Sequence, residues 1–202
     1  MECAMKVNPP PSRLGFVAAG RSAFDFVTEP PYSLWLTDQD EGRIGYEGDD
    51  VVLAVLHDLM SYELDIALSR PSVAEEVQHP YTLADLIRVA DPVRARAYRQ
   101  FAATSTASVQ RGTANLASEF QKYGLEALAG SADFYQKMST ARAESIRQFG
   151  FDLADKAARE NAERAWQQRD FQGVVKAYRA MADRLSQVER ERLRYAGQRL
   201  QR

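Results

Sequence analysis

The sequence predicts an α+β fold, in which a small antiparallel β-meander with an N-terminal helix is followed by a helical C-terminal region. Between residues 23 and 69 the chain runs in short stretches of apolar and polar residues separated by turns rich in Gly and Asp. That pattern is typical of an antiparallel meander. After Pro92 there is no further proline, and the chain is rich in Ala, Arg, Gln, Glu and Leu, which favours helices.

The N-terminal part is predicted to be a lead-in, a short helix and a first strand. Residues 1–11 end in the run NPPP and are expected to be disordered. Ser12 is a candidate cap for a short helix that is expected to stop near Gly20. The stretch AFDFV, residues 23–27, alternates as a strand does, so the sheet is expected to begin there.

Four further runs complete the predicted sheet. They cover residues 33–36, 43–47, 51–57 and 62–69. Both faces of the 51–57 run are apolar, so this strand is expected to be central and covered on both sides, at least in part. The last run has one apolar face and one polar face, which carries Glu63, Asp65 and Ser69 and is expected to face solvent. Such a strand belongs near the edge of an antiparallel sheet.

Residues 81–202 are predicted to be helical and to pack against the sheet domain, residues 12–80. Thr82 with Asp85, and Ser186 with Glu189, match the capping box that opens a helix. After the first of these helices, Pro92 occupies a first-turn position, where its missing N–H costs nothing. Further helices are expected near residues 92–103, 107–129, 132–148, 151–168, 171–184 and 187–200.

The segment Arg169-Asp170-Phe171-x-x-Val174-x-x-x-Tyr178 resembles the second helix of a tetratricopeptide unit. In that family a Gly-Asp-Tyr corner leads to a small residue and then an aromatic one. Here Arg169 stands where glycine is usual, and Val174 where alanine is usual. The resemblance covers about 30 residues and occurs once, without a second copy at the family's period of about 34 residues. It implies a helical hairpin for packing or peptide contact and brings no catalytic residues.

The layout as a whole, a compact sheet followed by a helical tail, resembles small uncharacterised bacterial proteins, some of which accompany toxin–immunity or defence loci. That resemblance implies a non-catalytic protein-binding module, such as an immunity or adaptor protein. Two other classes stay open. One is an enzyme whose site is assembled from dispersed residues, and the other is a nucleic-acid binder that uses the basic C-terminal half.

Composition and missing motifs argue against several classes. One cysteine, Cys3, and two histidines are too few for a Cys/His zinc cage or an internal disulfide. No run of 18 or more apolar residues predicts a membrane span, and the N-terminus lacks a secretory signal core. A cytoplasmic protein is therefore expected. The motifs G-x-x-x-x-G-K-[ST], G-x-G-x-x-G, G-x-S-x-G and H-E-x-x-H are absent, so no enzyme activity and no cofactor are predicted.

The net charge of −2 conceals an asymmetry along the chain. Residues 1–90 hold 6 Lys/Arg and 15 Asp/Glu, a net charge of −9. Residues 91–202 hold 20 Lys/Arg and 13 Asp/Glu, a net charge of +7. The split indicates that the two halves pack on each other, or that one of them meets a charged partner.

The candidate partner-binding residues are the carboxylates of two predicted turns. They are Asp38, Asp40, Glu41, Asp49 and Asp50. Carboxylates at such a rim would steer a basic protein partner. The run DQDEG lacks the third carboxylate, the glycine position and the two-helix frame of a calcium loop, so no metal site is predicted.

The alternative site, for nucleic acid, is the basic C-terminal helix. Its candidate contacts are Arg190, Arg192, Arg194 and Arg199, because arginine clusters suit phosphates. Tyr195 is the only aromatic residue among them, which weakens a single-strand interpretation. The pair His57-Asp58 falls at the end of a strand and the start of a turn, so His57 is predicted to be structural and no catalytic residue is assigned.

Overall fold

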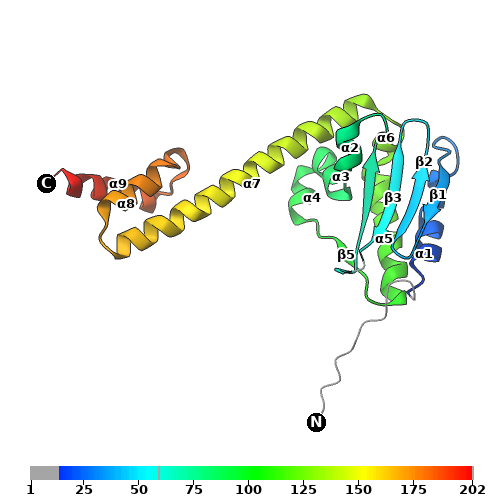
Figure 1. Cartoon of the computed structure of the whole chain (residues 1–202), viewed down its shortest axis with the longest axis horizontal. Coiled ribbons are helices and arrows are strands. Elements are labelled where there is room, and N and C mark those ends of the chain that lie inside the picture. Colours follow the sequence, from blue (N-terminus) through cyan, green and yellow to red (C-terminus); the bar gives the residue numbers. More distant parts are fainter. Residues whose placement is uncertain (1–13, 59, 202) are drawn as a thin grey trace, which may run out of the picture. The chain divides into compact units, whose positions relative to one another are not determined.

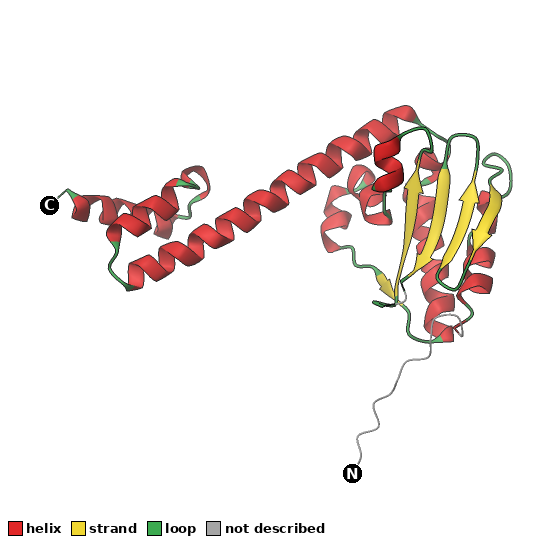
Figure 2. Cartoon of the chain, in the orientation of Figure 1, coloured by secondary structure: helices red, strands yellow, loops and turns green. Residues whose placement is uncertain are grey.

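The computed structural model describes residues 14–58 and 60–201, and it confirms the predicted α+β fold (Figure 1). Contacts divide the chain into two compact units, residues 1–142 and residues 143–202, here named the sheet unit and the helical unit. The sheet unit contains every described strand (Figure 2). Helix α7, Ala132–Gln167, begins in the sheet unit and continues into the helical unit.

The sheet unit combines one antiparallel sheet with short and medium helices. The strands lie in the order β1-β2-β3-β4-β5. Their bounds are Trp35–Gln39, Arg43–Glu47, Val52–His57, Glu63–Ser69 and Phe101–Ala102. The helices α1 to α6 cover Phe16–Ala23, Ala74–Gln78, Leu83–Ala90, Pro92–Ala97, Thr106–Tyr123 and Leu125–Leu128, and the 3-10 turn η2 covers Asp25–Val27.

One face of the sheet forms the core of this unit. The register places Ile44, Val55 and Ile66 side by side across β2, β3 and β4, and none is more than 1% exposed. Helices α1 and α5 cover this face from behind in the view of Figure 2. Burying each such side chain is worth about 1.5–3 kcal/mol, so the alternation predicted for these strands is what holds the unit together.

The sheet unit includes helices that follow residue 80. Leu86 and Ile87 of α3 and Leu116 of α5 are fully buried and belong to the same apolar cluster as Leu64 and Leu68 of the sheet. Residues 81–142 of the predicted helical region therefore belong to the same compact unit as the sheet.

The strand predicted at residues 23–27 is wrong. Helix α1 ends at Ala23, and the next residues form η2. Phe24 and Val27, three positions apart, are both fully buried, and a helical turn places such a pair on one face. The alternation of apolar and polar residues in this stretch therefore reflects one helical turn and not a strand.

The predicted helix stop at Gly20 is also wrong, because α1 continues to Ala23. A Cβ on Gly20 would lie 2.5 Å from Cδ1 of Ile44, so this glycine allows the helix to approach the sheet closely. The predicted cap Ser12 and the predicted lead-in, residues 1–11, lie outside the described residues.

The prediction that one face of the last strand lies in solvent is wrong at Asp65 and Ser69, because each is only 8% exposed. Asp65 accepts a hydrogen bond from the backbone N–H of Leu83 at 3.2 Å and another from Nε2 of Gln100 at 2.5 Å. Burial raises the pKa of Asp65. The carboxyl group therefore connects β4 to the start of α3. It is buried because segments later in the chain, which carry its two partners, cover it.

The predicted helix starts are confirmed more closely than the helix lengths. Both capping boxes are present, and Pro92 opens α4. The helix expected to reach residue 103 stops at Ala97, and β5 follows. The two helices expected on either side of Gly150 are one helix, α7, since a helix interior tolerates glycine at about 1 kcal/mol relative to alanine. No helix in the described part of the chain is long and apolar enough to cross a membrane.

Candidate functional site

The helical unit is built from the C-terminal part of α7 with α8, Phe171–Arg179, and α9, Gln187–Leu200. Its core contains Ala162, Ala165, Val174, Val175, Tyr178, Met181, Leu185 and Ala196. The small side chains come mainly from α7, and Val174 and Tyr178 of α8 pack in the same cluster. Ala196 of α9 lies in this core and Leu193 packs against it, which leaves the charged side of α9 outside.

The corner between α7 and α8 is left-handed at Arg169. Arg169 has a φ of 59°, the left-handed region in which glycine is the favoured residue. Asp170 then accepts a hydrogen bond from the backbone N–H of Gly173 at 2.9 Å and caps α8. The local conformation accounts for the glycine usual at this position, and the family resemblance itself stays a prediction.

Replacing Arg169 by glycine should raise the free energy of unfolding of the helical unit by about 0.5–1 kcal/mol. Relief of the left-handed conformation, about 1–2 kcal/mol for a residue with a Cβ, exceeds the added chain entropy of glycine, about 0.4–1 kcal/mol. Thermal and urea unfolding followed by circular dichroism would measure the change. Arg169→Ala, which keeps the Cβ, is the control, and a glycine variant no more stable than the alanine variant would contradict the explanation.

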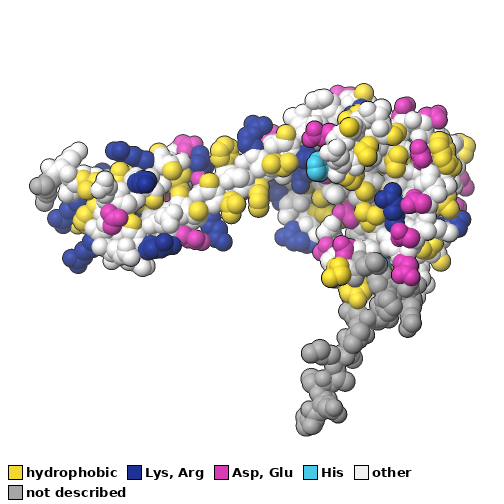
Figure 3. Space-filling view, viewed as in Figure 1, with side chains coloured by type: hydrophobic (Ala, Val, Ile, Leu, Met, Phe, Trp, Pro, Cys, Tyr) yellow, Lys and Arg dark blue, Asp and Glu magenta, His cyan; other side chains and the backbone are white. Residues whose placement is uncertain are grey.

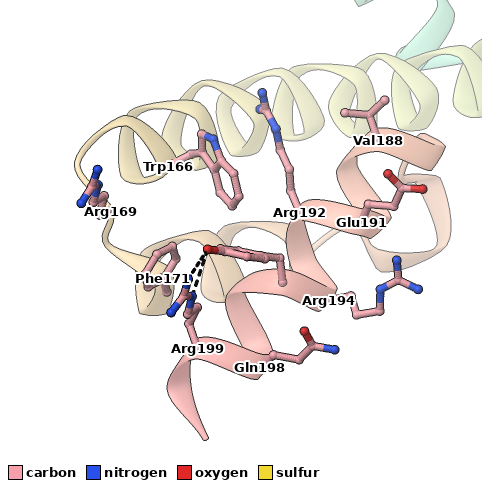
Figure 4. A pocket seen from close by; sticks show the side chains of 10 residues that line it. Trp166, Arg169, Phe171, Val188, Glu191, Arg192, Arg194, Gln198 and Arg199 are labelled. Atoms are coloured by element: carbon pink, nitrogen blue, oxygen red, sulfur yellow. Dashed lines mark hydrogen bonds between the residues drawn. The ribbon is translucent and has the colours of Figure 1, made fainter. Parts of the chain in front are cut away.

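A pocket of about 940 Å³ lies between the end of α7, the start of α8 and α9 (Figure 4). We name it the basic–aromatic pocket, and its lining residues are Trp166, Arg169, Phe171, Val188, Glu191, Arg192, Arg194, Tyr195, Gln198 and Arg199. The space-filling view shows Lys and Arg side chains over α8 and α9 with apolar atoms between them (Figure 3). Cationic and aromatic groups therefore share one concave surface.

Three aromatic rings form the floor of this pocket. The ring centroids of Trp166 and Tyr195 are 5.6 Å apart, those of Phe171 and Tyr195 5.9 Å, and those of Trp166 and Phe171 6.3 Å. All three contacts are edge-to-face, an arrangement worth about 0.5–1.5 kcal/mol per pair. Trp166 and Phe171 are half-buried, whereas Tyr195 is 41% exposed. The rings stabilise one another and still leave apolar surface open.

The arginines of the pocket differ in what they contact. Arg192 lies over the Trp166 ring at 5.3 Å and pairs with Glu163. Arg199 donates two hydrogen bonds to Oη of Tyr195, at 2.9 and 2.7 Å. Within the described residues of the helical unit, ion pairs to carboxylates are made by Arg159, Arg184 and Arg192. Arg169, Arg194 and Arg199 thus have no carboxylate partner among the described residues.

The structure brings together most of the basic residues predicted from sequence. Arg192, Arg194 and Arg199 line the pocket, whereas Arg190 does not. Sequence reasoning missed Trp166 and Phe171, because it considered only the aromatic residue on the last helix. A signal was present, since these two residues flank the corner of the predicted hairpin.

The predicted acidic residues form two separate surfaces. Asp38, Asp40 and Glu41 lie at the β1–β2 end of the sheet, and Asp49 and Asp50 at the β2–β3 end. All five are exposed. Oδ2 of Asp38 pairs with Arg43 at 3.1 Å, and Oδ1 of Asp40 accepts from the backbone N–H of Gly42 at 2.8 Å. Asp38 of β1 thus has a partner on β2, and Asp40 has one in the turn. Partner binding by the five stays a prediction.

His57 lies at the end of β3 and is only 1% exposed. Its Nε2 hydrogen-bonds the backbone oxygen of Ala103 at 3.0 Å, and its ring packs against Phe16 with centroids 5.3 Å apart. Burial lowers the pKa of His57 below the ordinary value of 6.5, although the hydrogen bond to Ala103 and the charge of Asp58 act in the opposite direction. Burial therefore favours the neutral form of the ring, which is part of the core.

The His57→Gln variant should remove one part of the acid sensitivity of the sheet unit. Because the pKa is lower in the folded state, the unfolded chain binds a proton first, and stability is lost as the pH falls below about 6.5. The difference in unfolding free energy between wild type and variant should shrink between about pH 7 and pH 5, while any binding activity changes by less than a few-fold. Loss of binding at an unchanged melting temperature would show that His57 is functional.

No protein-family model, no curated protein and no solved structure matches this chain. Among the described residues, no group of three or more His, Cys, Asp and Glu side chains is placed to hold a metal ion.

Proposed function

We propose that the chain is a non-catalytic protein-binding module whose main recognition surface is the basic–aromatic pocket. The observation that carries the proposal is a set of three guanidinium groups beside partly exposed aromatic rings. Those of Arg169, Arg194 and Arg199 have no carboxylate partner within residues 14–58 and 60–201. Arginine and aromatic side chains are the groups that most often dominate the binding energy of protein interfaces.

The geometry favours a protein partner over a nucleic acid. Residues 143–202 hold 13 Lys/Arg and 9 Asp/Glu, a net charge of +4, which is modest for a phosphate backbone. Glu191 also lines the pocket and would repel phosphates. The aromatic rings meet edge-to-face, whereas base stacking needs open ring faces.

The lining of the pocket also favours binding over catalysis. It includes neither histidine nor cysteine, and its one carboxylate, that of Glu191, is exposed. A catalytic site would need a nucleophile or a general base held beside an orienting partner. The setting we propose, following the layout resemblance, is that of an immunity or adaptor protein.

The acidic end of the sheet is a second candidate surface, for a basic partner. Asp40 and Glu41 lie around a hollow with Asp58, Glu63 and Met60, and Met60 is 91% exposed. The hollow also includes Arg43, but carboxylates outnumber it, and an exposed apolar side chain beside them suits a protein contact that charge steers and apolar burial stabilises.

A random peptide library displayed on phage tests the main proposal when it is selected on the immobilised full chain. Clones retained by the wild type should be lost from the double variant Arg194→Ala/Tyr195→Ala and kept by Asp40→Ala/Glu41→Ala. If the clones still bind Arg194→Ala/Tyr195→Ala but no longer bind Asp40→Ala/Glu41→Ala, the recognition surface is the acidic end of the sheet. Failure to enrich any clone would count against peptide recognition by either surface.

A further inference from the structure

The basic–aromatic pocket has features that specify its ligand more narrowly, on the condition that the proposed function holds. We infer that the pocket binds an acidic segment of a partner protein, in which carboxylate side chains flank one large apolar side chain. Two features support this inference: the placement of the cations and the apolar side chains that lie beside them.

The cations stand around the pocket and do not converge on one point. Figure 4 shows Arg169 and Arg194 on opposite sides, with Arg192 between them. Arg194 and Arg199 are five residues apart on α9, which is about 7.5 Å of helical rise. Separate guanidinium groups suit several single carboxylates along a chain better than one compact dianion such as phosphate, because each guanidinium pairs with one planar carboxylate.

Apolar side chains of the pocket lie open beside these cations. Tyr195 is 41% exposed and Val188 is 61% exposed, and both line the pocket. An apolar side chain placed there would cover this surface, at about 25 cal/mol for each Å² removed from water. An aromatic side chain could add edge-to-face contacts to the existing three rings. The middle of the bound segment is therefore apolar and its flanks are acidic.

The remaining charges select against a basic or neutral segment. The guanidinium groups of Arg169, Arg194 and Arg199 are accessible and lack carboxylate partners among the described residues, so a lysine or arginine in the ligand would be repelled. Glu191 lies beside Val188, and its charge would repel phosphates and carboxylates alike, so the acids of the ligand pair with the guanidinium groups elsewhere in the pocket. Charges at the rim of an interface mainly set association rate and specificity.

Fluorescence anisotropy with dye-labelled synthetic peptides tests this ligand class on the full chain. The probe is Gly-Asp-Glu-Gly-Phe-Gly-Glu-Asp-Gly, and its analogues replace either all acids by the matching amides or the central Phe by Ala. The amide analogue should bind at least about 10-fold more weakly, since charge-assisted hydrogen bonds are lost. The Ala analogue should bind about 5-fold more weakly, and binding of the acidic probe should weaken toward about 0.5 M salt.

Variants on one helix supply a matched control. Arg194→Gln should weaken binding of the acidic probe about 5-fold, whereas Arg190→Gln, on the same helix but outside the pocket, should change it less than 2-fold. Arg169→Gly should weaken binding while raising stability, which separates a contact role from a folding role. Equal effects of Arg190→Gln and Arg194→Gln would overturn the assignment of this site.

The outcomes separate the ligand class from the proposed function. If the amide analogue or neutral library clones bind as well as the acidic probe and Arg194→Gln still matters, the acidic-segment inference fails and peptide recognition stands. If neither the probe nor any library clone binds, both fail. If a labelled 15-residue oligothymidylate binds more tightly than the acidic probe, the pocket is a nucleic-acid site and both fail.

Discussion

Replacing Asp85 by asparagine should lower the free energy of unfolding of the sheet unit by about 2–3 kcal/mol. The Asp85 side chain is 10% exposed and pairs with Arg88 at 2.6 Å and with Arg142 at 2.5 Å. It also accepts the backbone N–H of Thr82 at 3.1 Å. Removing one member of a largely buried pair leaves the other charge without compensation, which costs about 3–5 kcal/mol when burial is complete. Because Arg142 is 23% exposed, burial is incomplete, and the expected loss is the smaller value of about 2–3 kcal/mol.

The same substitution should change the response to acid. Burial raises the pKa of Asp85, but hydrogen bonds from Arg142 and Thr82 outweigh that effect and lower the pKa below 3.8. A carboxylate with a lowered pKa contributes stability above its unfolded pKa and loses it as the pH falls through the folded pKa. The gap between wild type and variant in urea unfolding should therefore narrow below about pH 4.

The exposed acid Asp133 supplies the control for this variant. It lies on α7 and pairs with Lys137, but its side chain is 74% exposed. Asp133→Asn should change stability by less than about 0.5 kcal/mol. An equally small effect of Asp85→Asn would mean that the network around Arg142 does not stabilise the unit.

Truncating Phe120 to alanine should cost about 3–5 kcal/mol, the largest effect expected for a single side chain here. Phe120 of α5 is fully buried, and its ring lies 5.8 Å from that of Phe24 and 6.4 Å from that of Phe26. The substitution would remove contacts between α5 and the segment that follows α1. Because a folded domain is stable by only about 5–15 kcal/mol in total, the sheet unit should become marginal.

Two tryptophans allow this loss to be assigned to one unit. Trp35 is in the sheet unit and Trp166 in the helical unit, and the sequence has no others. In a Trp166→Phe background, urea unfolding followed by fluorescence reports the sheet unit alone. Phe149→Ala, at a 69% exposed site on α7, should lie within about 0.5 kcal/mol of wild type. A loss below about 1 kcal/mol for Phe120→Ala would contradict the role of this side chain in the core.

The features read correctly from sequence are those that depend on neighbouring residues. The capping box of Thr82 and Asp85 lies within one helical turn, and the alternation around Leu53 and Val55 lies within one strand. Each of these signals has a local physical cause. The capping box satisfies a free backbone N–H of the helix, and the alternation places apolar side chains on one face of the strand. The fold class followed from them.

The features that sequence reasoning missed depend on distant partners. Asp65 appeared to face solvent, but α3 covers it through Leu83, 18 positions later. The basic–aromatic pocket required Trp166 and Phe171 to meet Tyr195, and these three belong to three different helices. No local pattern places residues from separate elements around one cavity, so the arginines were predicted without the aromatic floor.

The exposed middle of α7 should be the first site that a protease cuts. Ile146, Phe149 and Leu153 are between 60% and 69% exposed, and a Cβ on Gly150 would have no neighbour within 4 Å. This stretch is therefore held by its own backbone hydrogen bonds with little side-chain packing, and such segments open at low free energy. Trypsin at low concentration should cut first at Arg147, and the two fragments would correspond closely to the two compact units, so that each can be studied without designing a truncation.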